Sequence, residues 1–292
     1  MKIKNIIILL RPHQYIKNIF VFAPLLFSFN FQYQNFLDVS IAFILFSMIA
    51  SSIYIFNDLA DIELDKEHPK KRYRPLASGN ISKALAKYLI VILSAVSLII
   101  AFLININLFT VLISYFILNI AYSLKLKHVA LVDIFIIATG FVLRLFAGAS
   151  VISNTLSMWI IIMTFLLALF LAIAKRRDDV IFALKGKETR KNISGYNLEF
   201  VNAVMVLMSA VIIVSYILYT VSSSVLNKLH THYLYFTTFF VILGIMRYMQ
   251  ITFVYENSGS PTKLVLKDKF LQITILMWFV SFLIIVRGVN FG

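Results

Sequence analysis

Long apolar stretches separated by short polar segments run through the whole chain. Most of these stretches reach the length of roughly 18 residues that spans a bilayer, and the nine candidates are residues 19–31, 38–60, 84–104, 106–123, 131–152, 157–174, 201–223, 233–250 and 270–290. Pro24 interrupts the first stretch, and polar residues predict tight turns at Asn105 and at Ser153. The pattern predicts an all-α, polytopic membrane protein of about nine transmembrane helices that forms one domain over residues 1–292.

Lysine and arginine are concentrated in alternate polar segments. Of the 27 basic residues, 22 lie in residues 1–18, 61–83, 124–130, 175–200 and 251–269. The intervening segments hold Lys228 and, near the C-terminus, Arg287. Because cytoplasmic loops carry an excess of lysine and arginine, we expect the N-terminus and the five basic segments on the cytoplasmic side of the cell's inner (plasma) membrane.

Composition limits the classes of function. The chain is 61% hydrophobic and carries a formal net charge of +14, which in a soluble protein would suggest binding to nucleic acid. In a membrane protein the basic cytoplasmic loops and the anionic lipid headgroups of the bilayer account for such a charge, so we expect no nucleic-acid partner. The chain has no cysteine, which excludes disulfides and thiolate metal sites.

The second apolar stretch ends in an acidic segment whose spacing suits metal binding. Asn57, Asp58, Asp61 and Asp65 form the pattern N-D-x-x-D-x-x-x-D, and in a continuous helix the three aspartates share one face. Carboxylates so placed suit Mg²⁺, which also favours the phosphate oxygens of a substrate. A basic run follows at once, comprising His68, Lys70, Lys71, Arg72 and Arg74. The segment predicts a Mg²⁺–diphosphate site, with a solvated loop of mixed charge as the alternative.

Further polar residues are predicted at the same cytoplasmic level. They are Tyr122 and Lys127 near the end of the fourth stretch, Lys175, Arg176 and Asp179 after the sixth, and Arg11, Lys17 and Asn18 near the N-terminus. Snorkelling cations, an interfacial helix or a stop-transfer cluster would explain these groups without a site. Arg144 lies deeper in the fifth stretch, where an arginine normally faces a cavity or a partner, and a structural ion pair is its alternative.

These motifs together resemble a known family. The acidic pattern followed by R-P-L-A-S-G resembles the UbiA-type intramembrane prenyltransferase superfamily. Within it, RPHQYIKN at 11–18, DKEHPKKRYRPLASG at 65–79 and LKHVALVDIFIIATGFVLRLFAGA at 126–149 resemble the polyprenyl-phosphate phosphoribosyltransferase branch. The resemblance covers nearly the whole chain and implies a UbiA-like bundle of nine helices.

The resemblance also implies substrates and roles. The donor would be 5-phosphoribosyl 1-diphosphate held through Mg²⁺, the acceptor a polyprenyl phosphate from the bilayer, and the released product diphosphate. By position, the metal and diphosphate would be held by Asn57, Asp58, Asp61 and Asp65, and the donor phosphates by Lys70, Arg72 and Arg74. Arg11 and Lys17 would contact a phosphate, and Asp179 would be the second acidic position.

One departure keeps alternatives open. Members of the superfamily usually carry a second D-x-x-x-D motif in the 175–200 segment, whereas this chain has Asp178 and Asp179 side by side and its next acidic residue, Glu188, much later. Whether a second metal binds there is therefore open, as is the formation of a homo-oligomer. A prenyltransferase acting on an aromatic or quinone-precursor acceptor is the second hypothesis. A transporter of an anionic solute is the third, but the polar residues gather at one face rather than at the membrane midplane.

Overall fold

The computed structural model describes residues 2–28, 32–152, 156–186, 191–255 and 261–288. The chain forms two compact units, residues 1–161 and 162–292, and each is described by itself. Eight helices in the described residues are long and apolar enough to cross a membrane. The prediction of an all-α polytopic membrane protein with about nine spans is confirmed. The predicted turn at Ser153 lies outside the described residues.

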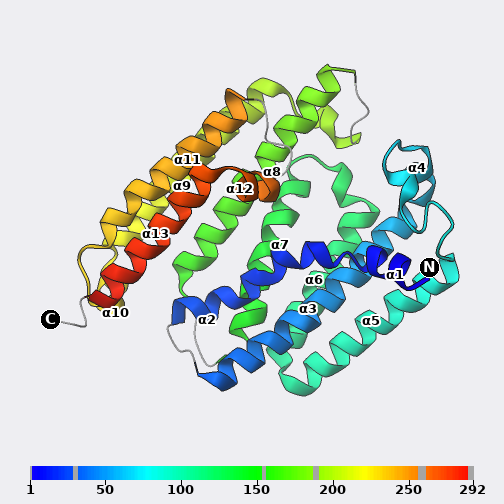
Figure 1. Ribbon diagram of the computed structural model, residues 1–292, viewed down its shortest axis with the longest axis horizontal. Helices are drawn as coiled ribbons and strands as arrows, with labels where there is room; N and C mark the ends of the chain where they lie inside the picture. Colours follow the sequence, from blue (N-terminus) through cyan, green and yellow to red (C-terminus); the bar gives the residue numbers. More distant parts are fainter. Residues whose placement is uncertain (1, 29–31, 153–155, 187–190, 256–260, 289–292) are drawn as a thin grey trace. The chain divides into compact units, whose positions relative to one another are not determined.

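The first unit is built from a run of long helices joined by short ones (Figure 1). Its elements are α1 (Lys2–Leu10), η1 (Pro12–Phe22), α2 (Ala23–Ser28), α3 (Tyr33–Ala60), α4 (Ile62–Glu67), η2 (Lys71–Tyr73), α5 (Lys83–Ile104), α6 (Ile106–Leu124), η3 (Leu126–His128) and α7 (Val132–Ala149). The η elements are 3₁₀ helices. Of the most apolar 18 consecutive residues of each helix, 61% are buried in α3 and 11% in α5. Helix α3 therefore lies at the centre of the unit.

Where the sequence predicts a first span at residues 19–31, the described residues 12–28 form a broken segment rather than one long helix. Contacts between side chains follow this segment antiparallel along α3: Arg11 binds Asp58, Tyr15 binds Ser51, Asn18 binds Ser47, and Phe22 packs on Phe43. The segment runs from Pro12 through η1 and α2 to Ser28. A 3₁₀ helix rises about 2.0 Å per residue, so this short segment reaches about as far as a bilayer core of roughly 30 Å.

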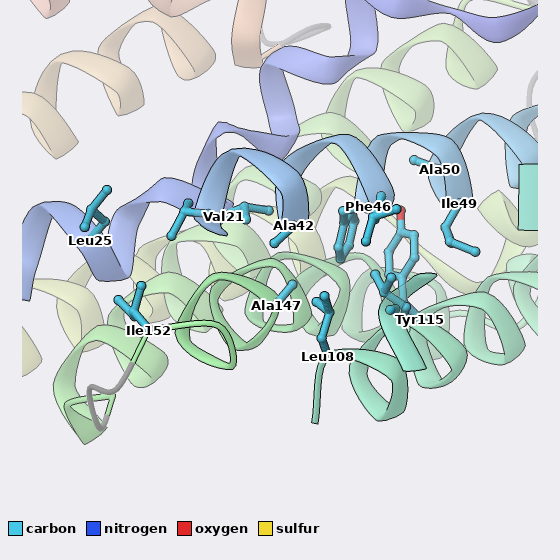
Figure 2. Packing of buried hydrophobic residues seen from close by; sticks show 14 of the residues in the cluster. Val21, Leu25, Ala42, Phe46, Ile49, Ala50, Leu108, Tyr115, Ala147 and Ile152 are labelled. Carbon is cyan, nitrogen blue, oxygen red and sulfur yellow. The ribbon is translucent and has the colours of Figure 1, made fainter. Parts of the chain in front are cut away.

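An apolar core joins the broken segment to α3, α6 and α7. Figure 2 shows Phe46 of α3 beside Tyr115 of α6, and their ring centroids lie 4.4 Å apart. Gly148 of α7 faces the segment so closely that a Cβ atom there would lie 1.8 Å from the carbonyl oxygen of Val21. Only glycine permits this close approach of two backbones. The approach buries the irregular segment against protein, where the backbone polar groups that lack helical partners are shielded from lipid.

Polar caps fix the helix hairpin of the first unit. The Asn105 side chain accepts a hydrogen bond from the Asn107 backbone N–H at 2.7 Å and so caps α6. Its amide group also donates to the Ser150 carbonyl at 3.0 Å, which ties the hairpin to the end of α7. The turn predicted at Asn105 is confirmed.

The second unit repeats the helical pattern. Its elements are α8 (Met158–Leu184), whose first residues precede the boundary, η4 (Lys191–Gly195), α9 (Leu198–Val221), α10 (Ser223–Leu229), η5 (Leu234–Thr237), α11 (Thr238–Phe253), α12 (Pro261–Lys267) and α13 (Lys269–Gly288). Two polar clusters join its helices: Tyr216 bonds Thr237 at 2.8 Å and Trp278 at 2.7 Å, and Arg247 pairs with Asp268 at 2.8 Å.

Candidate active site

The acidic pattern lies where α3 ends and α4 begins. Asp58 is in the last turn of α3, Asp61 is the residue between the helices, and Asp65 is in α4. The backbone at Asp61 departs from helical geometry, with φ −97° and ψ 11°. Asp58 and Asp65 are each 2% exposed, and buried carboxylates require charged or hydrogen-bonding partners.

Arg74 joins the two buried carboxylates. Its NH1 atom donates to Asp58 Oδ1 at 2.9 Å and to Asp65 Oδ2 at 2.7 Å, so both carboxylates converge on one nitrogen. Arg11, at the N-terminus of η1, also donates to Asp58 Oδ1. The Nζ atom of Lys71 lies 3.8 Å from Asp65 Oδ1. Cations from two distant parts of the chain therefore meet the end of α3.

Asp61 faces a different cation. Lys127 of η3, in the connection between α6 and α7, donates to Asp61 Oδ1 at 2.6 Å. Because the helix is interrupted at Asp61, the three aspartates are not lined up on one cation: Asp58 and Asp65 share Arg74, and Asp61 pairs with Lys127. Glu63 has instead an exposed pair with Lys66, whose hydrogen bond lowers the pKa of Glu63, so Glu63 is outside this cluster.

The cluster carries more positive than negative charge. Three carboxylates contact four cations, and the seven residues are Asp58, Asp61, Asp65, Arg11, Lys71, Arg74 and Lys127. The carboxylates at 58 and 65 are enclosed, whereas the four cations keep part of their side chains accessible, from 14% for Lys127 to 45% for Lys71. A polyanion such as a diphosphate can therefore reach the cations, and hydrogen bonds to charged donors are the strong ones for phosphate.

The carboxylates also fit a divalent metal ion. Among the described residues, no group of three or more acidic or histidine side chains is arranged as a complete metal site. Two buried carboxylate oxygens nevertheless converge on the position of Arg74 NH1. Mg²⁺ commonly uses one or two carboxylates and completes its shell with substrate phosphates and water, so the donor set suits Mg²⁺ bound together with a diphosphate.

Arg144 lies in a buried cage of aromatic rings. Its Cζ atom lies 5.0 Å from the ring centroid of Phe46 and 5.1 Å from those of Tyr115 and Phe141. The guanidinium donates to Asn18 Oδ1 at 2.9 Å, to the Tyr115 hydroxyl at 3.1 Å and to the Gly140 carbonyl at 2.6 Å. These hydrogen bonds and ring faces compensate the buried guanidinium charge for its lost contact with water. They also hold η1 against α7.

The placement of Asn18 corrects one prediction. Asn18 was expected at the same level as Arg11, but it is 1% exposed and binds Ser47 and Arg144. Ser47 precedes Asp58 by 11 residues of α3, which at 1.5 Å per residue is about 16 Å. The reason is the 3₁₀ geometry of η1, which carries seven residues along α3 instead of keeping them at one level.

The other predicted residues of the first unit are exposed or half-buried. Arg72 is exposed and donates to the Tyr73 hydroxyl at 2.8 Å, and Lys70 is exposed beside it. Lys17 in η1 and Tyr122 near the end of α6 are half-buried. Asn57 is half-buried and its carbonyl accepts the Asp61 N–H at 3.0 Å.

The second acidic position belongs to the second unit. Arg176 is 1% exposed and its NH1 atom donates to Asp179 Oδ2, three residues later on α8. Lys175 is half-buried on the same helix. Arg177, which the sequence did not single out, donates to Asn202 of α9 at 2.9 Å and to the Thr252 carbonyl of α11 at 2.7 Å. Arg177 thus joins three helices of this unit.

Sequence reasoning missed two contributors in the first unit. Lys71 lies near Asp65, and spacing alone does not say which lysine of HPKKRYR turns toward that carboxylate. Nothing in the local sequence of α6 indicates that the Tyr115 hydroxyl accepts a hydrogen bond from Arg144.

Known proteins resemble this chain over most of its length. The model of the UbiA prenyltransferase family matches residues 20–280. A decaprenyl-phosphate phosphoribosyltransferase from Mycolicibacterium smegmatis is 32% identical over 288 residues, covering 94% of this chain and 90% of that protein. The protein of that name from Corynebacterium glutamicum is 31% identical over 275 residues, covering 92% of this chain and 82% of the relative.

A solved structure shares the fold. The UbiA homologue from Archaeoglobus fulgidus, bound to GPP and Mg²⁺, superimposes with a TM-score of 0.71 at 21% identity, covering 96% of this chain and 99% of that chain. The match of the family model and the identity to the two relatives extend across both units. The chain therefore belongs to the UbiA prenyltransferase family.

Proposed function

We propose that this protein transfers 5-phosphoribose from 5-phosphoribosyl 1-diphosphate to a polyprenyl phosphate and releases diphosphate. One observation carries the proposal: two buried carboxylates converge on a single cationic position, surrounded by accessible cations in excess. That arrangement suits a metal-bound diphosphate with a second phosphate nearby. The similarity to decaprenyl-phosphate phosphoribosyltransferases over more than nine tenths of the chain supports the choice of donor and acceptor.

The residues have separate roles in this proposal. The metal and the donor diphosphate are held by Asn57, Asp58, Asp61 and Asp65, and the donor phosphates also by Lys70, Arg72 and Arg74. Arg11, Lys17, Tyr122 and Lys127 contact substrate phosphates, and the buried Asn18 and Arg144 hold η1 against α7. Lys175, Arg176 and Asp179 supply the second charged group. The support is strongest for Asp58, Asp65, Arg74 and Arg11, whose charged groups are in contact.

The chemistry breaks one carbon–oxygen bond and forms another. The bond from ribose C1 to the diphosphate oxygen breaks, the diphosphate leaves with the electron pair, and a phosphate oxygen of the acceptor bonds to C1. Mg²⁺, when bound, withdraws charge from the leaving diphosphate. Arg74 and Arg11 stabilise the negative charge that develops on that group, which is the kind of electrostatic assistance that dominates such reactions. The acceptor phosphate is already anionic, so it needs no general base.

We also propose that the site faces the cytoplasm. The support is the concentration of lysine and arginine in alternate segments. The chain has no cysteine, so single cysteines report their side of the membrane without background. Lys66→Cys should react with a membrane-impermeant maleimide only after the cells are opened, and Lys228→Cys should react in intact cells. The opposite result would reverse the orientation.

A paired donor assay tests the reaction. The purified protein is given labelled 5-phosphoribosyl 1-diphosphate with a polyprenyl phosphate, and separately a labelled isoprenyl diphosphate with aromatic acceptors. We expect lipid-linked label in the first reaction and its loss with EDTA. Label transferred only from the isoprenyl diphosphate would instead establish a prenyltransferase acting on aromatic acceptors, and full activity in EDTA would exclude the proposed metal.

A further inference from the structure

The cations of the candidate site occupy the same oxygen atoms that a metal ion would use. Arg74 NH1 lies 2.9 Å from Asp58 Oδ1 and 2.7 Å from Asp65 Oδ2, and Lys127 Nζ lies 2.6 Å from Asp61 Oδ1. A metal ion that binds these oxygens competes with the guanidinium group of Arg74 or the ammonium group of Lys127, and at Asp58 Oδ1 also with Arg11. Within the cluster, therefore, each carboxylate contact is open to competition between a side chain and the metal.

The charges of the cluster decide which ligand can bind alone. Three carboxylates and four cations leave a net charge of about +1 before the neighbouring Lys70 and Arg72 are counted. A free divalent cation would add two positive charges to a site that is already positive. A diphosphate would instead be attracted, and it supplies new acceptors for the displaced cations.

The two competing cations lie on connecting segments, whereas the carboxylates lie at helix ends. Arg74 follows η2 in extended geometry, at φ −63° and ψ 145°, and its side chain is 27% exposed. Lys127 belongs to the three-residue η3. Asp58 is held in the last turn of the long helix α3. Arg74 and Lys127 can therefore follow a diphosphate while Asp58 keeps its place in α3.

We propose that Arg74 and Lys127 act as internal competitors of the metal, so that a divalent ion binds tightly only together with a diphosphate. The oxygens of the diphosphate take over the two cations, and the released carboxylates then ligate the metal. Binding of metal and of diphosphate is thereby coupled, and such coupling must be equal in both directions. This inference rests on the proposed function only in taking a diphosphate as the ligand.

Metal binding without turnover tests the coupling. The full-length protein in lipid nanodiscs is titrated with Mn²⁺, and free Mn²⁺ is measured by electron paramagnetic resonance with and without inorganic pyrophosphate, after correction for their complex in solution. For the wild type we expect weak Mn²⁺ binding alone and much tighter binding with pyrophosphate. Arg74→Gln should bind Mn²⁺ alone about tenfold more tightly, which is the low end for a close charge pair, and pyrophosphate should then help less.

Matched variants separate competition from general charge. Lys66→Gln removes a positive charge from the same segment, but Lys66 pairs with Glu63 at 2.9 Å rather than with the cluster. It should change Mn²⁺ affinity by less than about twofold, because exposed charges are screened. Arg74→Lys keeps the charge and should stay close to the wild type. Lys127→Gln should tighten Mn²⁺ binding in the same direction through Asp61, and it decides the question alone if Arg74→Gln does not fold.

The outcomes distinguish this inference from the proposed function. Unchanged or weaker Mn²⁺ binding in folded Arg74→Gln and Lys127→Gln would overturn the competition, even if phosphoribosyl transfer is found. Conversely, transfer from an isoprenyl diphosphate would overturn the proposed function, while tighter Mn²⁺ binding in the variants would still support the competition.

Discussion

In the first unit Asp58 is paired with Arg11, 47 residues away in the sequence, whereas in the second unit Asp179 is paired with Arg176 of its own helix. An i,i+3 pair requires only its own helix to bring the two side chains together. The pairs of Asp58 and Asp61 require three separate elements to meet. The difference teaches that acidic residues in basic loops are not equivalent, and that long-range pairing, more than local spacing, marks the stronger candidate site.

The largest expected effect is on the reaction rate, and it compares Asp58 with Asp179. Asp58→Asn should lower phosphoribosyl transfer about 10³-fold, because it removes charge that holds metal and cations at the leaving group. Asp179→Asn should lower the rate by a smaller factor, because Asp179 pairs with one cation of its own helix and not with cations from separate segments. Both rates are measured with labelled donor on protein of equal folded content. Equal losses would show that the two acidic positions contribute alike.

The next effect concerns packing rather than chemistry. Gly148→Ala should destabilise the protein by more than about 3 kcal/mol, because its Cβ would lie 1.8 Å from the Val21 carbonyl oxygen between two backbones. Gly244 of α11 is the matched position in the second unit, where a Cβ would lie 3.7 Å from Thr274 Cγ2 in ordinary contact. Gly244→Ala should stabilise by about 0.5–1 kcal/mol. Thermal unfolding of the two variants is followed by tryptophan fluorescence. Similar changes in stability for Gly148→Ala and Gly244→Ala would contradict the difference in packing between the two positions.

A smaller effect separates buried hydroxyl groups in the two units. Tyr115→Phe should cost about 2 kcal/mol, because its hydroxyl accepts a hydrogen bond from the buried Arg144. Tyr248 of α11 is 4% exposed, and its hydroxyl has no hydrogen-bond partner in the part of the chain that the structure describes. Tyr248→Phe should therefore be neutral or slightly stabilising. The same unfolding measurement tests both variants. A larger loss of stability for Tyr248→Phe than for Tyr115→Phe would reveal a partner for the Tyr248 hydroxyl.

The smallest effect depends on pH. The hydrogen bond from Arg247 lowers the pKa of Asp268 in the second unit below its usual value. A carboxyl with a lower pKa in the folded state stabilises the protein above its unfolded pKa of about 3.9, and this stabilisation is lost as the pH falls through the folded pKa. Asp268→Asn should therefore lower the free energy of unfolding by less than about 1 kcal/mol at pH 7. The loss should become progressively smaller as the pH falls.

The first unit provides the control for the pH dependence. Glu63 has its pKa lowered by Lys66, but both side chains are exposed. Glu63→Gln should shift the unfolding midpoint less than Asp268→Asn does at pH 7, since exposed ion pairs are screened. A midpoint for Asp268→Asn that differed from the wild type equally at pH 3 and pH 7 would attribute the loss to packing and not to charge.

Much of the fold follows from local pattern, because a bilayer demands long apolar helices and tolerates few alternatives. The turn at Asn105 and the acidic end of α3 were predictable for this reason. The pairing of Asp61 with Lys127, 66 residues apart, was not predictable from spacing, and neither was the depth of Asn18, because both depend on 3₁₀ segments whose path is set by packing. The need for glycine at position 148 was not predictable either, because it arises from the Val21 carbonyl on another element.

The backbone of Arg11 has a consequence for how such a chain can change. Arg11 adopts φ 55° and ψ 53°, the left-handed conformation that costs a non-glycine residue about 1–2 kcal/mol. Glycine would relieve that strain but would leave Asp58 without one of its cations. Arg11→Gly would therefore set the relief of backbone strain against a buried carboxylate that loses a cation, and the variant should transfer poorly. At this position the protein keeps a less stable backbone in exchange for its function.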